Sequence, residues 1–400
     1  MSIASVIPQA RGDRQGYWVS LARIAGLFFS LRLCFTLLLF PHDQALATAV
    51  TLAGSFTLLV GSVGRWLALA PTDGGRYQTP SAVKWVAAYL TLALISLSWS
   101  LTPSTAIALA YWSGMAADVL TVVFATSSSE SSQVLFDLLS GFIFGAVLVA
   151  AVAWCLPTMP DLRLGDEDLL HPNAIGFEFA IAILCSIYLA AQAVWAKWAG
   201  VFLAITLLRT LSKASIIAFL AGAGYWFIKD TEISSRAKAK IGMALTAVLL
   251  FSWGLLEAYA EIYMQGSQAE TLTGRTLIWA TSFDIAMERP WLGHGFYSFR
   301  WLVPPLHNFQ PWQAHDELLQ QFFCYGVLGV VVTIALYVAL CRQVHQSSRN
   351  RLTRLASALL IFALVRGLVD TERFDLSFPL WLIAAVSLSM ARTKSSPAIT

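Results

Sequence analysis

Residues 198–228 read "WAGVFLAITLLRTLSKASIIAFLAGAGYWFI", an apolar stretch interrupted by two charged side chains, Arg209 and Lys213. One helix over this stretch would be about 45 Å long at 1.5 Å per residue, which exceeds the roughly 30 Å hydrocarbon core of a bilayer. It would also reverse every later segment and place the basic loops 229–240 and 342–354 outside, against the positive-inside bias. We therefore predict two spans joined as a hairpin, with residues 209–215 at its outer tip.

The composition of the whole chain also predicts a membrane protein. Of 400 residues, 57% are hydrophobic and 12% are charged, whereas soluble domains carry about 25% charged residues. Apolar runs long enough to cross a bilayer recur along the chain. We expect an all-α polytopic membrane protein with about twelve transmembrane helices, forming one integral membrane domain over residues 1–400. The predicted spans are 23–40, 45–64, 82–99, 104–125, 133–155, 173–190, 192–208, 214–228, 238–257, 317–341, 352–368 and 376–391.

The placement of Lys and Arg sets the predicted orientation. With both termini in the cytoplasm, the inner loops hold the basic segments 229–240 and 342–354. The outer loops together hold fewer cations and most of the acids, for example in 159–173 and 366–375. This distribution follows the positive-inside bias of membrane proteins. One large outer loop remains, residues 258–316, between the ninth and tenth spans.

Several function classes find no support in the sequence. The net charge is +3 and the cations form short clusters between spans rather than a basic stripe, so we expect no nucleic-acid partner. The five cysteines contain no C-x-x-C pair, and the acidic "DED" at 166–168 is a weak match to a metal site. We predict no metal and no cofactor.

The large outer loop carries a helix signal and a well-placed cation. Apolar residues spread over a broad face between Thr276 and Glu288, and Pro290 ends the pattern. This predicts a short amphipathic helix at the membrane surface. Arg275 stands at its start, where the helix dipole adds to the attraction for an anion.

Four outer side chains suggest a site for a phosphorylated lipid: Arg209, Lys213, Arg275 and His315. Arg209 and Lys213 lie four residues apart and would share a face in helical geometry. A guanidinium matches phosphate oxygens, and a lipid diphosphate is the natural ligand at a membrane surface. A histidine can accept a proton at neutral pH, so His315 could act as a base on an incoming hydroxyl. The residues alone leave an enzyme and a transporter both open.

Four segments resemble recurring stretches of the O-antigen ligase and polymerase superfamily. They occur in the family's order as "HPNAIGF" (171–177), "RTLSKAS" (209–215), "GRTLIWATSFDIAMERPWLGHGFYSF" (274–299) and "HDELLQQFFCYGVLG" (315–329). The resemblance implies a twelve-span fold of the GT-C-like class of lipid-linked glycosyltransferases, with a periplasmic active site. It also implies metal-independent, inverting transfer of a glycan from undecaprenyl diphosphate to a hydroxyl acceptor, which for the ligases is a sugar of lipid A–core.

The resemblance further implies roles for particular residues. The family's two functional arginines and its histidine, the general base, fall on Arg209, Arg275 and His315. An acidic residue of the last outer loop is also implicated in some members, and Asp370 or Asp375 is its match here. One departure is that the residue after the histidine is Asp rather than the common Asn. Its acidic side chain, and that of the next residue, are expected to complement the dipole of the new helix.

The single dominant outer loop resembles the ligase arrangement, so a ligase is favoured over a polymerase or another lipid-linked oligosaccharyltransferase. A polysaccharide or lipid transporter is the rival from another class, and it should show internal repeats and broken helices in mid-membrane. No convincing repeat joins the two halves, although Arg32 is a conspicuous charge inside a span. The expected partners are undecaprenyl-diphosphate-linked O-antigen, lipid A–core and lipids of the bacterial inner membrane. Lys213 would help to hold the diphosphate, and Trp312 would line the cleft.

Overall fold

The computed structural model describes residues 21–32, 34, 43–69, 79–127, 131–157, 159, 162–166, 170–251, 272–306 and 310–395. These residues form helices joined by turns, with no strand among them, and residues 21–32 are helical. The other helices are α2 (Gln44–Ala68), α3 (Ser81–Ser96), α4 (Thr105–Ser127), α5 (Ser131–Cys155), α6 (Pro172–Leu189), α7 (Val194–Thr210), α8 (Lys213–Lys229), α9 (Ser235–Phe251), α11 (Leu272–Ala286), α12 (Phe299–Leu302), α13 (Glu317–Gln346), α14 (Arg351–Gly367) and α15 (Leu380–Ser395). Parts of the large outer loop, and most of the acidic "DED" stretch, lie outside the described residues.

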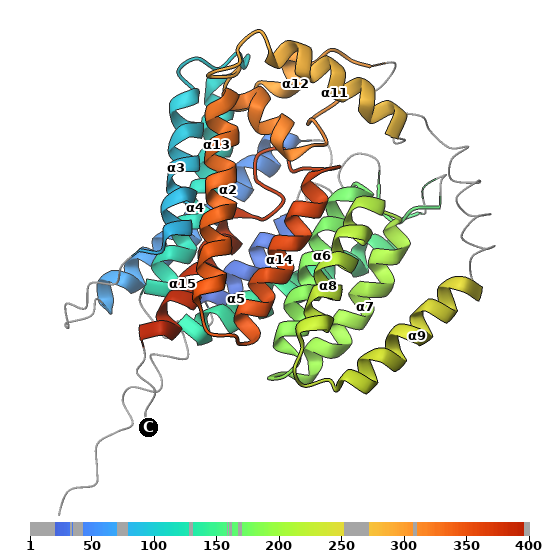
Figure 1. Cartoon of the computed structure of the whole chain (residues 1–400). Helices are drawn as coiled ribbons and strands as arrows, with labels where there is room; N and C mark the ends of the chain where they lie inside the picture. The colour runs from blue at the N-terminus through green and yellow to red at the C-terminus, as the bar shows by residue number, and fades with distance from the viewer. Residues whose placement is uncertain are drawn as a thin grey trace, which may run out of the picture.

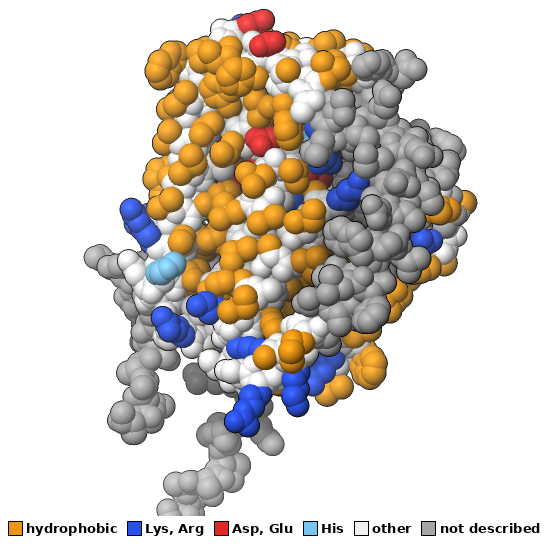
Figure 2. Space-filling model, turned by 45° about the vertical axis from the view of Figure 1, so that its right-hand side comes forward, with side chains coloured by type: hydrophobic (Ala, Val, Ile, Leu, Met, Phe, Trp, Pro, Cys, Tyr) orange, Lys and Arg blue, Asp and Glu red, His pale blue; other side chains and the backbone are white. Residues whose placement is uncertain are grey.

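Every predicted span overlaps a helix. Within the described ranges, five helices, namely α2, α4, α5, α6 and α13, are both long and apolar enough to cross a membrane. Figure 2 shows apolar side chains covering the middle of the molecule, with Lys and Arg gathered towards its lower end. Trp198 is 72% exposed and Val60 is 70% exposed, and hydrocarbon solvates such side chains better than water does. A helical membrane protein is therefore confirmed, whereas the count of twelve spans stays a prediction.

The predicted hairpin is present as α7 and α8. The chain reverses at Leu211, whose φ of 53° lies in the left-handed region, and the next residue is extended. Because this turn separates the two helices, Arg209 ends one helix and Lys213 begins the other. The expectation that Arg209 and Lys213 share a helical face was wrong, because the left-handed residue interrupts the helix between them.

The two basic segments lie at the same end of the bundle, as predicted. Arg354 Nη1 lies 2.7 Å from Asp230 Oδ1, and Arg351 Nη1 lies 2.8 Å from Glu232 Oε1. These ion pairs join the loop after α8 to the start of α14. The helices α11 and α12 lie at the opposite end (Figure 1), which we call the site end.

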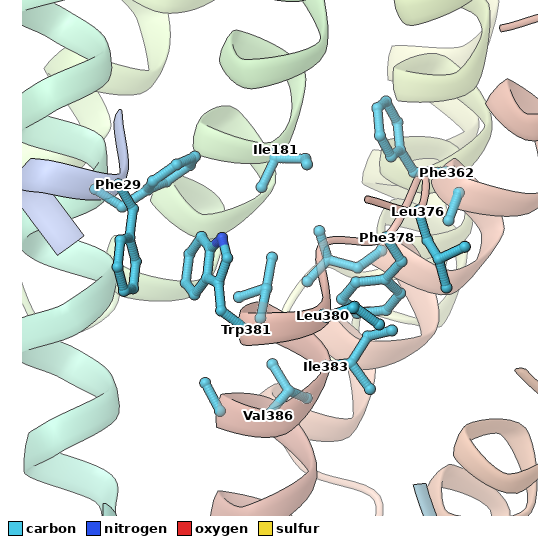
Figure 3. Close-up of a cluster of buried hydrophobic side chains, with 14 of the residues drawn as sticks. Phe29, Ile181, Phe362, Leu376, Phe378, Leu380, Trp381, Ile383 and Val386 are labelled. Atoms are coloured by element: carbon cyan, nitrogen blue, oxygen red, sulfur yellow. The ribbon is translucent and has the colours of Figure 1, made fainter. Parts of the chain in front are cut away.

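The last helix, α15, is the centre of the core. Between Leu380 and Val386 each side chain is at most 3% exposed, as expected for a helix that is apolar on every face. Trp381 lies 5.0 Å from Phe29 and 5.4 Å from Phe142 between ring centroids (Figure 3). This packing holds the preceding loop, residues 368–379, in place at the site end.

A polar contact explains the charge inside the first span. Arg32 Nη1 lies 2.5 Å from Asp118 Oδ2 of α4, and Ser55 of α2 donates a hydrogen bond to the same carboxylate at 2.9 Å. Burial of a charge is tolerated when the charge is paired. Arg32 is therefore accounted for as a contact between helices.

The turn that follows α11 packs into a break in α13. Gly326 has φ 63° and ψ −156°, and a Cβ there would lie 2.4 Å from the Trp291 carbonyl carbon. A Cβ on Gly293, φ 64°, would lie 2.5 Å from the Cys324 carbonyl carbon. Three backbone hydrogen bonds of 2.7–2.9 Å join the turn to the helix: His294 N to Phe323 O, Gly295 N to Cys324 O, and Val327 N to Pro290 O. Only glycine fits these two positions, because both the φ angle and the close backbone exclude a side chain.

Candidate active site

His315 lies in the turn that precedes α13. Its φ is 53°, which is uncommon for a residue other than glycine. Asp316 follows as the N-cap of α13 and accepts a hydrogen bond from Leu319 N at 2.7 Å. The predicted helix-dipole role of Asp316 is thus confirmed. Asp and Asn cap helices equally well, so the departure from the family's Asn keeps this function.

A buried carboxylate orients the imidazole of His315. His315 Nδ1 lies 2.9 Å from Asp370 Oδ1, and the Asp370 side chain is fully buried while that of His315 is 15% exposed. A carboxylate accepts a hydrogen bond from Nδ1–H, which leaves Nε2 as the proton acceptor. The pair has the geometry of a base held by a third group.

Asp370 also contacts a buried arginine. Arg366, in the last turn of α14, is 1% exposed and places Nη2 3.3 Å from Asp370 Oδ2 and 2.9 Å from Glu372 Oε1. Burial alone would raise the pKa of Asp370, but the charges of Arg366, His315 and Arg275 outweigh it and hold the pKa well below its ordinary value. Asp370 is therefore a carboxylate throughout the physiological pH range.

Arg275 reaches the same loop from the start of α11. Its Nη1 donates a hydrogen bond to Val369 O at 2.5 Å, and its charge lowers the pKa of the neighbouring Asp370. A helix is therefore present where the sequence predicted one, although its two faces differ little in hydrophobicity, and it places Arg275 at the site end. The fold brings three predicted residues together, namely Arg275, His315 and Asp370.

Arg209 lies at the hairpin tip, apart from this group. Its Nη1 donates to Leu162 O at 3.2 Å, and its guanidinium carbon lies 5.9 Å from the centroid of the Trp154 ring. Within the described part of the chain, no hydrogen bond or ion pair joins Arg209 to His315 or Arg275. Lys213 is exposed at the start of α8. A bound molecule would have to bridge the two cationic positions.

Residues 198–334 match the family model described as O-antigen ligase. This range contains the hairpin tip, α11 and the turn of His315. Over 168 residues the chain is also 26% identical to the O-antigen ligase of Pseudomonas aeruginosa. Residues 198–334 therefore resemble the O-antigen ligase family. The alignment covers 42% of this chain and 39% of that relative, so the matched region spans about two fifths of the relative's length.

The second acidic candidate, Asp375, has a different position from Asp370. Its Oδ1 accepts hydrogen bonds from Leu376 N at 2.8 Å and from Leu380 N at 3.0 Å. Burial raises its pKa to about 7. Asp375 therefore supports the start of α15, whereas Asp370 is the acid in contact with His315.

Trp312 packs against two guanidinium groups. The guanidinium carbons of Arg300 and Arg373 are 3.3 Å and 4.1 Å from the centroid of the Trp312 ring. Trp312 also lines a pocket at the site end, together with Asp375. The expectation that Trp312 lines a cleft fits this placement.

His294 is buried in the turn that follows α11. It is 2% exposed and its Nε2 lies 2.8 Å from Ile285 O, because this turn inserts into the break of α13. Arg366 was missed, since an arginine at a helix end reads as an interface anchor. The available signal was its spacing of four residues from Asp370.

Proposed function

We propose that this protein transfers a glycan from undecaprenyl diphosphate to a sugar hydroxyl of lipid A–core. The transfer would take place on the periplasmic face of the bacterial inner membrane, as a step of lipopolysaccharide biosynthesis. The observation that carries the proposal is the His315–Asp370 contact of 2.9 Å beside the Arg275 guanidinium. The family match supports a glycosyl-transferring enzyme of the ligase or polymerase type.

His315 would act as the general base. Asp370 fixes the proton on Nδ1, so Nε2 accepts the proton of the acceptor hydroxyl as its oxygen attacks the anomeric carbon. The resulting imidazolium is stabilised by the adjacent carboxylate, which stays ionised. General base catalysis of this kind contributes about 10²–10⁴-fold to a rate.

The cations of the site end would receive the leaving group. As the new bond forms, the bond from the anomeric carbon to the diphosphate oxygen breaks and negative charge develops on the diphosphate. Arg275 and Arg209, helped by Lys213, would stabilise that charge without a metal. Attack from the face opposite the diphosphate inverts the anomeric configuration.

Arg366 would position the base rather than touch the substrate. It is 1% exposed and its guanidinium is shared between Asp370 and Glu372. The ring of Phe177 lies 4.1 Å from its guanidinium carbon, which ties α14 to α6. The cation thus keeps the Asp370 carboxylate ionised and facing His315.

The test is transfer from glycan-diphosphate-undecaprenol to purified lipid A–core, without added metal, followed as a shift of the lipopolysaccharide band. The wild-type protein should give the shift and His315→Ala should give none while remaining folded. His345→Ala is the matched control, because His345 is exposed near the end of α13, at the opposite end of the bundle from His315. Full activity of His315→Ala would overturn the assignment of the base. Elongation of the glycan on the polyprenol without lipid A–core would identify a polymerase instead.

A further inference from the structure

A second cationic group surrounds Trp312 at the site end. Arg300 belongs to α12 and Arg373 to the loop before α15, and their guanidinium carbons lie 3.3 Å and 4.1 Å from the Trp312 ring centroid. A cation over an indole face is attracted by the quadrupole of the ring. This attraction offsets the repulsion between the two guanidinium groups.

Neither of these cations has a carboxylate partner within 4 Å in the described ranges. Glu372 forms its ion pair with Arg366 instead, with 2.9 Å between Glu372 Oε1 and Arg366 Nη2. Burial lowers the pKa of Arg373, the charge of Glu372 raises it, and the charge of Arg300 lowers it again. The Arg300 Nε is buried without a hydrogen-bond acceptor among the described residues. Two guanidinium groups on one indole, one of them with an unsatisfied donor, suit the binding of a phosphate.

The pocket beside these arginines also offers groups that suit a sugar. Gln321 lines it, is 2% exposed, and has a buried Oε1 with no hydrogen-bond donor among the described residues. Tyr297 and Phe374 line another part, with ring centroids 5.5 Å apart. An amide oxygen can accept a hydrogen bond from a hydroxyl group, and aromatic rings can contact the apolar face of a sugar ring. Asp375 also lines the pocket, with Oδ1 already bound to two backbone amides.

The pocket adjoins the His315–Asp370 pair along both of its chain segments. Trp312 precedes His315 by three residues, and Arg373 follows Asp370 by three residues. Three residues span at most about 11 Å even when fully extended. A molecule held by the arginines can therefore extend to the base.

We propose that this pocket binds a phosphate monoester on a sugar of the acceptor, and so presents a neighbouring hydroxyl to His315. The inference rests on the proposed function for its place in the reaction, and adds the chemistry by which the acceptor is recognised. In this arrangement Arg275 and Arg209 bind the diphosphate of the donor, and Arg300 and Arg373 bind the phosphate of the acceptor.

Binding is tested without turnover, on the full chain in nanodiscs of phosphatidylcholine. Saturation-transfer-difference NMR compares glucose 6-phosphate with glucose as probes. Glucose 6-phosphate should bind to the wild-type protein and to His315→Ala, and glucose should bind at least about tenfold more weakly, as expected for loss of a hydrogen bond to a charged group. The double variant Arg300→Gln/Arg373→Gln should lose the signal. Arg289→Gln is the matched control, because Arg289 is exposed on the same outer loop, and it should bind like the wild type.

Steady-state kinetics and competition then distinguish three sources of the bound phosphate: the acceptor, the diphosphate of the donor, and a lipid headgroup. Arg373→Gln should raise KM for lipid A–core about tenfold and leave KM for the polyprenyl donor unchanged, with Arg373→Lys intermediate. A rise in the donor's KM instead would assign the pocket to the diphosphate. Displacement of the probe by phosphatidylglycerol in the nanodisc would assign it to a lipid headgroup. Either result overturns the proposal, as does equal binding of glucose and glucose 6-phosphate. If the probe binds but no transfer occurs, the proposed function fails and the sugar-phosphate site stands.

Discussion

Replacement of Asp370 by Asn tests the central contact of the proposed mechanism. The change keeps the shape of the side chain but removes the charge that lies 2.9 Å from His315 Nδ1. An amide no longer stabilises the imidazolium and can hold the ring in the wrong tautomer. Loss of an equivalent carboxylate in a serine protease lowers kcat about 10⁴-fold, so we expect a decrease in kcat of about 10²–10⁴-fold.

Asp370→Asn should also lower the stability of the protein. The structure allows this loss of stability to be separated from the loss of activity. Arg366 is 1% exposed and would lose one of its two carboxylates, keeping Glu372 at 2.9 Å. Breaking a buried ion pair costs about 3–5 kcal/mol, and the remaining partner should reduce this to about 1–3 kcal/mol.

Glu372→Gln provides the matched control. It also leaves Arg366 with one carboxylate, but Glu372 does not contact His315 among the described interactions. Transfer is measured under saturating donor and acceptor, and thermal midpoints are measured in the same detergent. Glu372→Gln should lose stability but keep kcat within about threefold. Equal losses of kcat in the two variants would refute the reasoning, because activity would then follow the charge balance of Arg366 rather than the orientation of His315.

Three further predictions concern the loop, the turn and the donor site. Because burial raises the pKa of Asp375 to about 7, the native state retains a proton that the unfolded state has lost. Stability should therefore fall as pH rises from about 4 to about 7, by at most about 4 kcal/mol, and Asp375→Asn should remove most of this dependence in thermal melts across that range. Gly326→Ala should lower the thermal midpoint strongly because its Cβ would meet the Trp291 carbonyl carbon at 2.4 Å, whereas Gly224→Ala, with no atom within 4 Å, should leave the midpoint unchanged or higher. Equal midpoints for the two glycine variants would contradict the description of the break. Arg275→Lys keeps the charge but loses the planar fork, so transfer should fall at least about tenfold, and wild-type rates would show that a point charge is sufficient.

The sequence predicted those features that depend on local composition. Apolar runs located the helices, and the two charges at 209 and 213 located the turn of the hairpin. The motif resemblance located Arg275 and His315, and restricted the acidic partner to two residues. What remained open depended on packing between distant segments: the choice between Asp370 and Asp375 was decided by which carboxylate faces the turn before α13.

Burial of charge was the other property that the sequence did not disclose. Arg366 ends α14 in a position where many membrane helices carry an exposed anchor, and nothing local indicates that it is enclosed by Asp370, Glu372 and Phe177. The environment of Trp312 could not be predicted from local sequence either, because Arg300 and Arg373 reach it from segments more than seventy residues apart. Such clusters arise only when the loops at the site end are folded against one another.

The backbone join between the turn at 290–295 and the break in α13 has a mechanical consequence. The helix is 30 residues long across its break at Gly326, at most about 45 Å, and tilting is one way in which such a helix accommodates a thinner bilayer. The join makes the turn follow that tilt, and α12 with Arg300 follows the turn within five residues. Bilayer thickness should thus change the spacing between the two arginines on Trp312, and transfer rates in nanodiscs of short-chain and long-chain lipids should differ accordingly.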